Sequence, residues 1–116
     1  MRSVVVRGEL PPEDLRSVVE NAGVEIQGGA AYAFGPTRIV FFLGRKHFFR
    51  TNSYLGLSLV AATDGTTQRI DIGQAGGGVG LMGLEWGAGD DIEAAVYNAL
   101  VQLLNERGLS AETQAP

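Results

Sequence analysis

The sequence predicts one α+β domain with the element order β-α-β4-α. Two segments, one near each end, have apolar residues at helical spacings of three and four. Between them, four segments alternate apolar and polar residues and are separated by short turns, as in an antiparallel meander. Because each predicted helix has a single apolar stripe, we expect both helices to pack on one face of a curved antiparallel sheet.

The first strand and the first helix occupy the N-terminal part of the chain. The segment 3–9 alternates, with Val4 and Val6 on one face, and so predicts a strand. A helix over 12–22 follows, because proline and acidic residues favour the first helical turn. Its apolar stripe consists of Leu15, Val18, Val19 and Ala22. Gly23 can adopt the left-handed conformation that ends a helix.

Four strands are expected between the helices. The segment 24–34 alternates from Val24 to Phe34, and Gly28-Gly29 within it suggests a bend or a bulge. After a turn at Gly35-Pro36, the segment 38–50 is either one long strand or a hairpin that pivots on 44–46. The segments 54–63 and 67–74 flank Asp64-Gly65, a dipeptide typical of a type I′ hairpin turn.

The last element is a helix that ends near Gly108. Asp90 followed by Glu93 has the spacing of a capping box. The apolar face consists of Ile92, Ala95, Val96, Ala99, Leu100, Leu103 and Leu104. We assign residues 1–108 to the domain and 109–116, which show no core pattern, to a flexible C-terminal tail.

Composition narrows the functional classes. The chain of 116 residues has no cysteine and one histidine, which argues against thiol chemistry, zinc fingers and two-histidine metal sites. A net charge of −4 argues against nucleic-acid binding. No apolar run is long enough for a signal peptide or a membrane span, so we expect a cytoplasmic protein without a membrane partner. No cofactor is expected.

The sequence contains the residues for a Ser-His-Asp triad and for a carboxylate metal site, but no motif supports either one. His47 could form a triad with Ser53 or Ser58 and with Asp64 or Asp71, but no nucleophile-elbow pattern accompanies them. Asp90, Asp91 and Glu93 could bind a hard metal ion, but helix capping explains the same positions. We therefore expect no catalytic and no metal-binding residues.

The most unusual segment is rich in glycine: eight of the 17 residues from 73 to 89 are glycine. Glycines allow backbone N–H groups to converge on an anion, yet the segment lacks the lysine of a phosphate loop and does not open a helix directly. It is either a bent connection or a ligand cradle. The segment 81–86, which ends at Trp86, is expected to form a short extra strand, or a lip over the sheet or over a partner.

The region 38–92 resembles a small, uncharacterised bacterial domain family. The pattern is a glycine-rich turn after a hydrophobic strand, then Trp-Gly and an acidic helix start. It is carried by Gly73, Gly76, Gly77, Gly78, Gly80, Trp86, Gly87 and Asp91. The resemblance implies a bacterial cytoplasmic domain and brings no known activity.

Two functions remain open. In the first, the protein is a non-catalytic interaction module that forms a homodimer through the sheet face that the helices leave bare. That face is expected to carry Tyr54, Val60, Ala62, Val40 and Phe42. In the second, the protein is a carrier or sensor of a small acidic or lipid-like ligand, with a cavity between the sheet and the C-terminal helix. The ligand-binding residues would be Gly76, Gly77, Gly78, Gly80, Arg45, Arg50 and Trp86, with Arg38 as a further source of positive charge.

Overall fold

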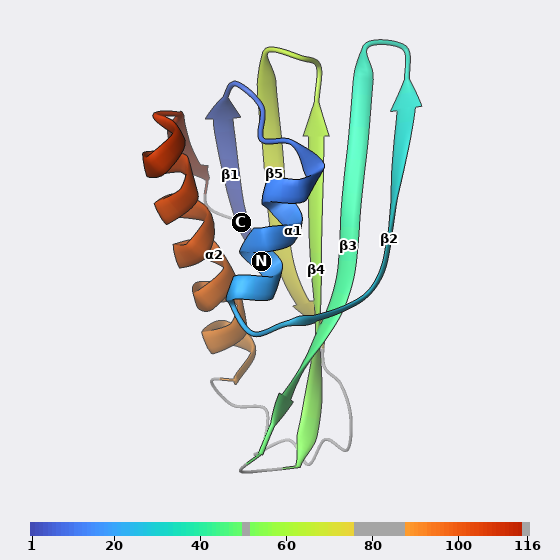
Figure 1. Ribbon diagram of the computed structural model, residues 1–116, viewed down its shortest axis with the longest axis vertical. Helices are drawn as coiled ribbons and strands as arrows, with labels where there is room; N and C mark the ends of the chain where they lie inside the picture. Colours follow the sequence, from blue (N-terminus) through green and yellow to red (C-terminus); the bar gives the residue numbers. More distant parts are fainter. Residues whose placement is uncertain (50–51, 76–87, 115–116) are drawn as a thin grey trace.

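Six strands form one open antiparallel sheet in the order β2-β3-β4-β5-β1-β6 (Figure 1). The computed structural model describes residues 1–49, 52–75 and 88–114. The elements are β1 (Arg2–Arg7), α1 (Pro12–Asn21), β2 (Glu25–Phe34), β3 (Thr37–Phe48), β4 (Ser53–Thr63), β5 (Thr67–Ala75), α2 (Ala88–Arg107) and β6 (Ser110–Gln114). The predicted α+β class is confirmed. The segment 81–86, where an extra strand was considered, lies outside the described residues.

Both helices lie on the same face of the sheet, as the single apolar stripe of each predicts (Figure 1). The centre of the α2 stripe is buried, with Leu100 at 0% exposure, whereas Ala95, Ala99 and Leu103 at its margin are only partly buried. Its partners are the alternating positions of the central strands, such as Leu59 on β4 and Ile70 on β5. We call this covered side the helix face and the opposite side the open face.

β3 is one continuous strand, which resolves the choice between a strand and a hairpin at 44–46. Its residues pair with β4 without interruption from Arg38 opposite Thr63 to Phe48 opposite Ser53. The turn predicted at Gly35-Pro36 connects it to β2, and Gly35 there has a φ of +55°. A glycine fits this left-handed conformation without the steric penalty of a side chain.

A bulge in β2 changes which side chains reach each face. Ile26 pairs with Gly44 and Gly28 with Leu43, so Gln27 is an extra residue in the ladder. The bulge predicted near Gly28-Gly29 is therefore present. The predicted continuous alternation from Val24 to Phe34 is wrong, because one extra residue moves all later side chains to the other face.

Gly44 permits the close approach of β2 to β3 beside this bulge. A Cβ atom at Gly44 would lie 2.5 Å from Cγ1 of Val24 and 2.9 Å from the carbonyl oxygen of Glu25. Both contacts are closer than side-chain carbons can normally approach, and the second is with backbone. The position therefore requires glycine for steric reasons.

The start of α2 differs from the prediction. The helix begins at Ala88, so Asp90 lies inside it rather than at its N-cap. Glu93, expected to complete a capping box, is buried instead, and its Oε2 accepts the backbone N–H of Gln74 at 3.1 Å. Its carboxylate thus joins α2 to β5, a long-range contact that local spacing could not reveal.

The predicted flexible tail is wrong over 110–114, which form strand β6. Gly108, with a φ of +68°, reverses the chain after α2, and the N–H of Leu109 binds the carbonyl of Leu104 at 2.9 Å. The chain is thereby directed along β1, where Ser110 to Gln114 pair with Arg7 to Ser3. The free backbone groups of β1 explain this strand, which has no hydrophobic pattern of its own.

Gly44→Ala should destabilise the protein by about 1–3 kcal/mol, the usual cost of overpacking a close contact. Gly28→Ala is the matched control, because nothing lies within 4 Å of a Cβ atom at Gly28. It should leave stability unchanged or raise it slightly. Urea unfolding at low micromolar protein concentration measures both. Equal stability of the two variants would contradict the close approach at Gly44.

Candidate functional site

The open face carries a strip of apolar side chains over β2, β3 and β4. Pairing brings Phe41 between Ala30 on β2 and Val60 on β4, and Tyr32 stacks on Phe41 with ring centroids 6.2 Å apart. We define the open-face strip as Tyr32, Phe34, Ile39, Phe41, Leu43 and Val60. The strip contains no charged side chain, and neither described helix lies over it (Figure 1).

Two residues expected on this face lie on the other one. Val40 pairs with Ala61, and Phe42 pairs with Leu59, whose side chains point toward the helices. The sequence could not decide this, because residues 39–43 are apolar at every position. Tyr54, Val60 and Ala62 do lie opposite the odd-numbered residues of β3, on the open face.

The strip is most exposed at the β2 edge. Val60 on β4 is 37% exposed, whereas Tyr32 and Phe34 on β2 are 51% and 68% exposed. Aromatic side chains contribute large contact areas in interfaces. A contiguous exposed apolar patch on neighbouring strands often marks a surface that contacts a partner. The β2 side of the strip is therefore the strongest candidate for contact with a partner.

A cluster of aromatic and basic residues occupies the far end of the same face. The guanidinium of Arg45 lies 4.5 Å from the ring centroid of Tyr54. The ring of His47 lies against Tyr54 and Phe49, with centroid distances of 4.7 and 4.6 Å. Nε2 of His47 is 3.1 Å from Oδ1 of Asn52. The imidazole of His47 thus packs edge-on against Phe49 and at a tilt against Tyr54.

The residues of the hypothetical triad have other partners. Asp71 accepts a hydrogen bond from Ser3, at 2.5 Å, and forms an ion pair with Arg69. Asp64 binds the turn that follows it. Within the described part of the chain, no three histidine, cysteine or acidic residues are grouped as metal ligands. Neither described helix is long and apolar enough to cross a membrane.

Of the residues proposed for ligand binding, only Arg45 can be placed. Gly76, Gly77, Gly78, Gly80, Trp86 and Arg50 lie outside the described residues. Arg45 is on the open face, whereas Arg38 is on the helix face, since it pairs with Thr63. The two arginines therefore cannot bind the same small ligand from one side of the sheet.

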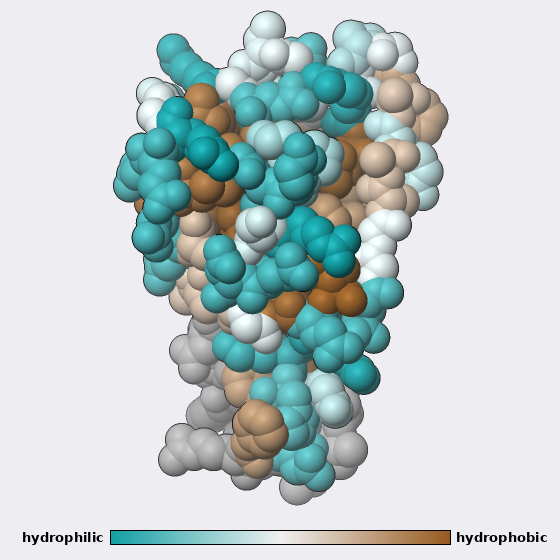
Figure 2. All heavy atoms as spheres, viewed as in Figure 1, coloured by the Kyte–Doolittle hydropathy of each residue, from teal (hydrophilic) through white to brown (hydrophobic). Residues whose placement is uncertain are grey.

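A pocket of about 270 Å³ lies on the helix face, beside the start of α1. Its apolar floor contains Ala31, Ala33, Val40 and Ala61, and its polar rim contains Glu9, Arg38, Thr63 and Gln68. Figure 2 shows hydrophobic surface between α1 and the β2 side of the sheet. The small residues at 29, 31 and 33 explain the hollow. The face to which they point depends on the bulge at Gln27, so the local sequence pattern does not reveal the pocket.

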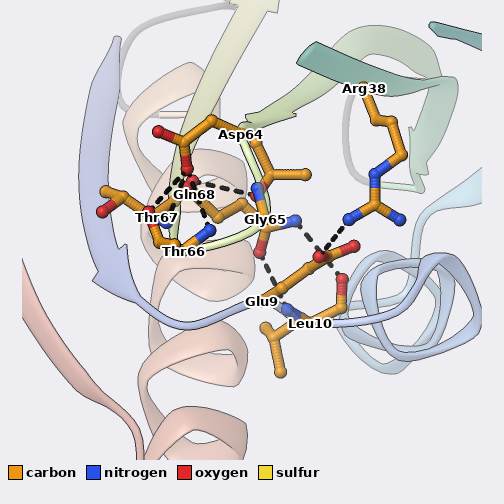
Figure 3. A network of polar contacts seen from close by, with 9 residues as sticks. Glu9, Leu10, Arg38, Asp64, Gly65, Thr66, Thr67 and Gln68 are labelled. Carbon is orange, nitrogen blue, oxygen red and sulfur yellow. Dashed lines mark hydrogen bonds and ion pairs between the residues drawn. The ribbon is translucent and has the colours of Figure 1, made fainter. Parts of the chain in front are cut away.

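Two polar contacts fix the rim of this pocket (Figure 3). Nη2 of Arg38 contacts Oε1 of Glu9 at 2.5 Å. The buried Gln68 side chain accepts the N–H of Leu10 at 3.0 Å and donates to the Leu10 carbonyl at 3.3 Å. Because Gln68 binds both backbone groups of Leu10, it fixes the chain just before α1 and hence the width of the pocket.

The turn between β4 and β5 is held by the carboxylate of Asp64 (Figure 3). Its Oδ1 accepts the backbone N–H groups of Thr66 and Thr67 at 2.9 and 3.0 Å, and the hydroxyl of Thr66 at 2.9 Å. A type I′ turn needs a positive φ at both of its central residues. Gly65 has a φ of +100°, but the φ of Asp64 is not positive, so the predicted type I′ turn is wrong. These N–H and O–H donors lower the pKa of Asp64 to about 2 from the usual 3.8.

Asp64 should therefore stabilise the fold only while it is ionised. Its pKa is lower in the folded than in the unfolded chain, so its contribution is full above about pH 4. It is lost as the pH falls toward about 2, where the folded-state carboxylate becomes protonated. Asp64→Asn should be less stable than the parent at pH 6, with the difference shrinking toward pH 2. Urea unfolding at a series of pH values measures it, and a constant difference would contradict this role.

No protein-family model, curated protein or solved structure matches this chain.

Proposed function

We propose that this protein is a non-catalytic interaction module that associates with a second copy of itself through the open-face strip. The observation that supports this is a strip of six neighbouring apolar side chains, four of them exposed and two half-buried, on a sheet face that neither described helix covers. Burying such a strip removes apolar surface from water and favours association.

A second copy fits the strip better than a charged partner would. The strip and the adjoining segment 26–37 contain no charged residue, although the whole chain has a net charge of −4. Two copies can therefore meet here without bringing like charges together at the contact. Twofold association of identical surfaces is also the commonest form of protein oligomer.

The parent should sediment at about twice 12.3 kDa at high micromolar concentration. The double variant Tyr32→Lys/Phe34→Lys should weaken the dimer at least about tenfold, because it removes two exposed aromatic contacts and places four like charges at the contact in the dimer. Sedimentation equilibrium measures both dissociation constants.

Phe49→Lys provides the control for this variant. Phe49 is 89% exposed but lies outside the open-face strip. The control should dimerise as the parent does. A monomeric parent, or a loss of dimer in the control alone, would count against the proposed surface.

A second candidate function, a carrier of a small acidic apolar ligand, is favoured by the pocket beside α1. The pocket is slightly smaller than the usual ligand site of at least about 300 Å³, and Arg38 lies on its rim beside the apolar floor. Arg38 contacts Glu9 through one nitrogen, and a guanidinium has five N–H donors. A ligand carboxylate could thus bind Arg38 beside Glu9, with its alkyl chain over Ala31 and Ala33.

This pocket lies beside α1, not beside α2 where a cavity was expected. The buried α2 residues Ile92, Val96, Leu100 and Leu104 are at most 2% exposed. They fill the space against β4 and β5.

Octanoate should raise the thermal unfolding midpoint of the parent by several degrees at saturating concentration. Octanol, which has the same chain and no charge, should have less effect. Arg38→Gln should abolish the difference between the two ligands, whereas Arg45→Gln, on the opposite face, should preserve it. An equal response of both variants would exclude Arg38 as the binding group.

A further inference from the structure

The two edges of the sheet differ in length and in charge. The β6 edge is a strand of five residues that includes Glu112. The β2 edge is a strand of ten residues, and no charged residue occurs from Ile26 to Thr37. Soluble proteins usually protect a sheet edge by shortness, charge or proline, because its free backbone groups can pair with another chain. Past its bulge, the β2 edge has none of these features.

The most exposed apolar side chains of β2 also lie at this edge. Phe34 and Tyr32 are the two most exposed members of the open-face strip. A strand added beside β2 would place its own side chains against both rings. Cross-strand contacts of aromatic residues stabilise a sheet. Packing of a second sheet over the open face would not satisfy the free backbone groups of β2.

The regular part of β2 is symmetric enough to pair with itself. Between the bulge and the turn, Gly28 to Phe34 pair one for one with Leu43 to Thr37 of β3. The middle residue of this stretch is Ala31. Antiparallel pairing around Ala31 places Phe34 opposite Gly28 and Tyr32 opposite Ala30, so each ring lies over a small residue. Centring on Ala30 would place Phe34 opposite Ile26, across the irregular bulge.

We propose that β2 pairs antiparallel with β2 of a second copy around Ala31 and joins the two six-stranded sheets into one. This inference rests on the self-association proposed above and specifies its geometry. Because the same strand pairs with itself, both free edges are used at once and the assembly closes as a dimer. The two open-face strips then lie side by side on one continuous face, and the part that the partner strand covers is the edge that carries Tyr32 and Phe34.

The test uses single cysteine variants, because the natural chain contains no cysteine. The variants are Ala31→Cys, Ala33→Cys and Glu112→Cys, oxidised at a concentration at which the parent is dimeric. In the proposed register the Cβ atoms at position 31 lie about 5 Å apart. Those at position 33 are displaced by four residues, about 13 Å along the strands, beyond the reach of a disulfide.

Ala31→Cys should form at least about ten times as much covalent dimer as either other variant. A short bifunctional maleimide repeats the series, since it tolerates less ideal thiol geometry. Preferential cross-linking at Ala33, or equal cross-linking at Glu112, would overturn the register while leaving self-association intact. A parent that sediments as a monomer would overturn both this inference and the proposed self-association.

Discussion

The sheet is wider than the area that its two described helices cover, and this mismatch determines which parts of the sheet stay exposed. Six strands about 4.8 Å apart span roughly 24 Å between the outermost axes, and strand side chains add to this width. Two helices about 10 Å wide cover only about 20 Å. Both helices cover the same face, and α2 packs mainly on β5 and β4. The β2 side consequently remains open on the helix face, and neither of the two described helices lies on the opposite face (Figure 1).

The bulge at Gln27 determines which side chains of β2 point to each face of the uncovered part of the sheet. It directs Tyr32 and Phe34 to the open face and leaves Gly29, Ala31 and Ala33 on the helix face. Large side chains thus gather where a partner chain can reach them, and small ones leave a hollow beside α1. The interaction surface and the pocket are two results of one inserted residue, since the side-chain period of a strand is two.

Polar contacts fix the position of α1 above this region. Gln68, on the covered face of β5, binds both backbone groups of Leu10, and Arg107 binds Asp14 through two nitrogens at 3.2 Å each. The first contact ties the beginning of α1 to the sheet, and the second ties it to the end of α2. These polar contacts add to the burial of Leu15, Val18 and Val19 in the core, and together they hold the helix in place. This fixed position keeps the pocket open.

The sequence by itself determined the class of fold and most of its elements, because those depend on local periodicity. The stripe of α2 around Leu100 and the alternation in β4 are strong enough to specify their own structure, and both helices were placed correctly on one face. The site was predicted only in part. Tyr54 and Val60 were assigned to the right face, whereas Val40 and Phe42 were not. Residues 39–43 are all apolar, so their sequence does not show which side chains point toward the helices.

Tertiary structure alone decided the features that depend on distant partners. β6 exists because β1 has free backbone groups beside the end of α2, and its own sequence has no strand pattern. Glu93 binds Gln74 rather than the start of its helix, because folding brings β5 within 3.1 Å of its carboxylate. The face to which Tyr32 points depends on one extra residue in a ladder. Each of these outcomes is set by pairing between segments far apart in the chain, which local patterns do not encode.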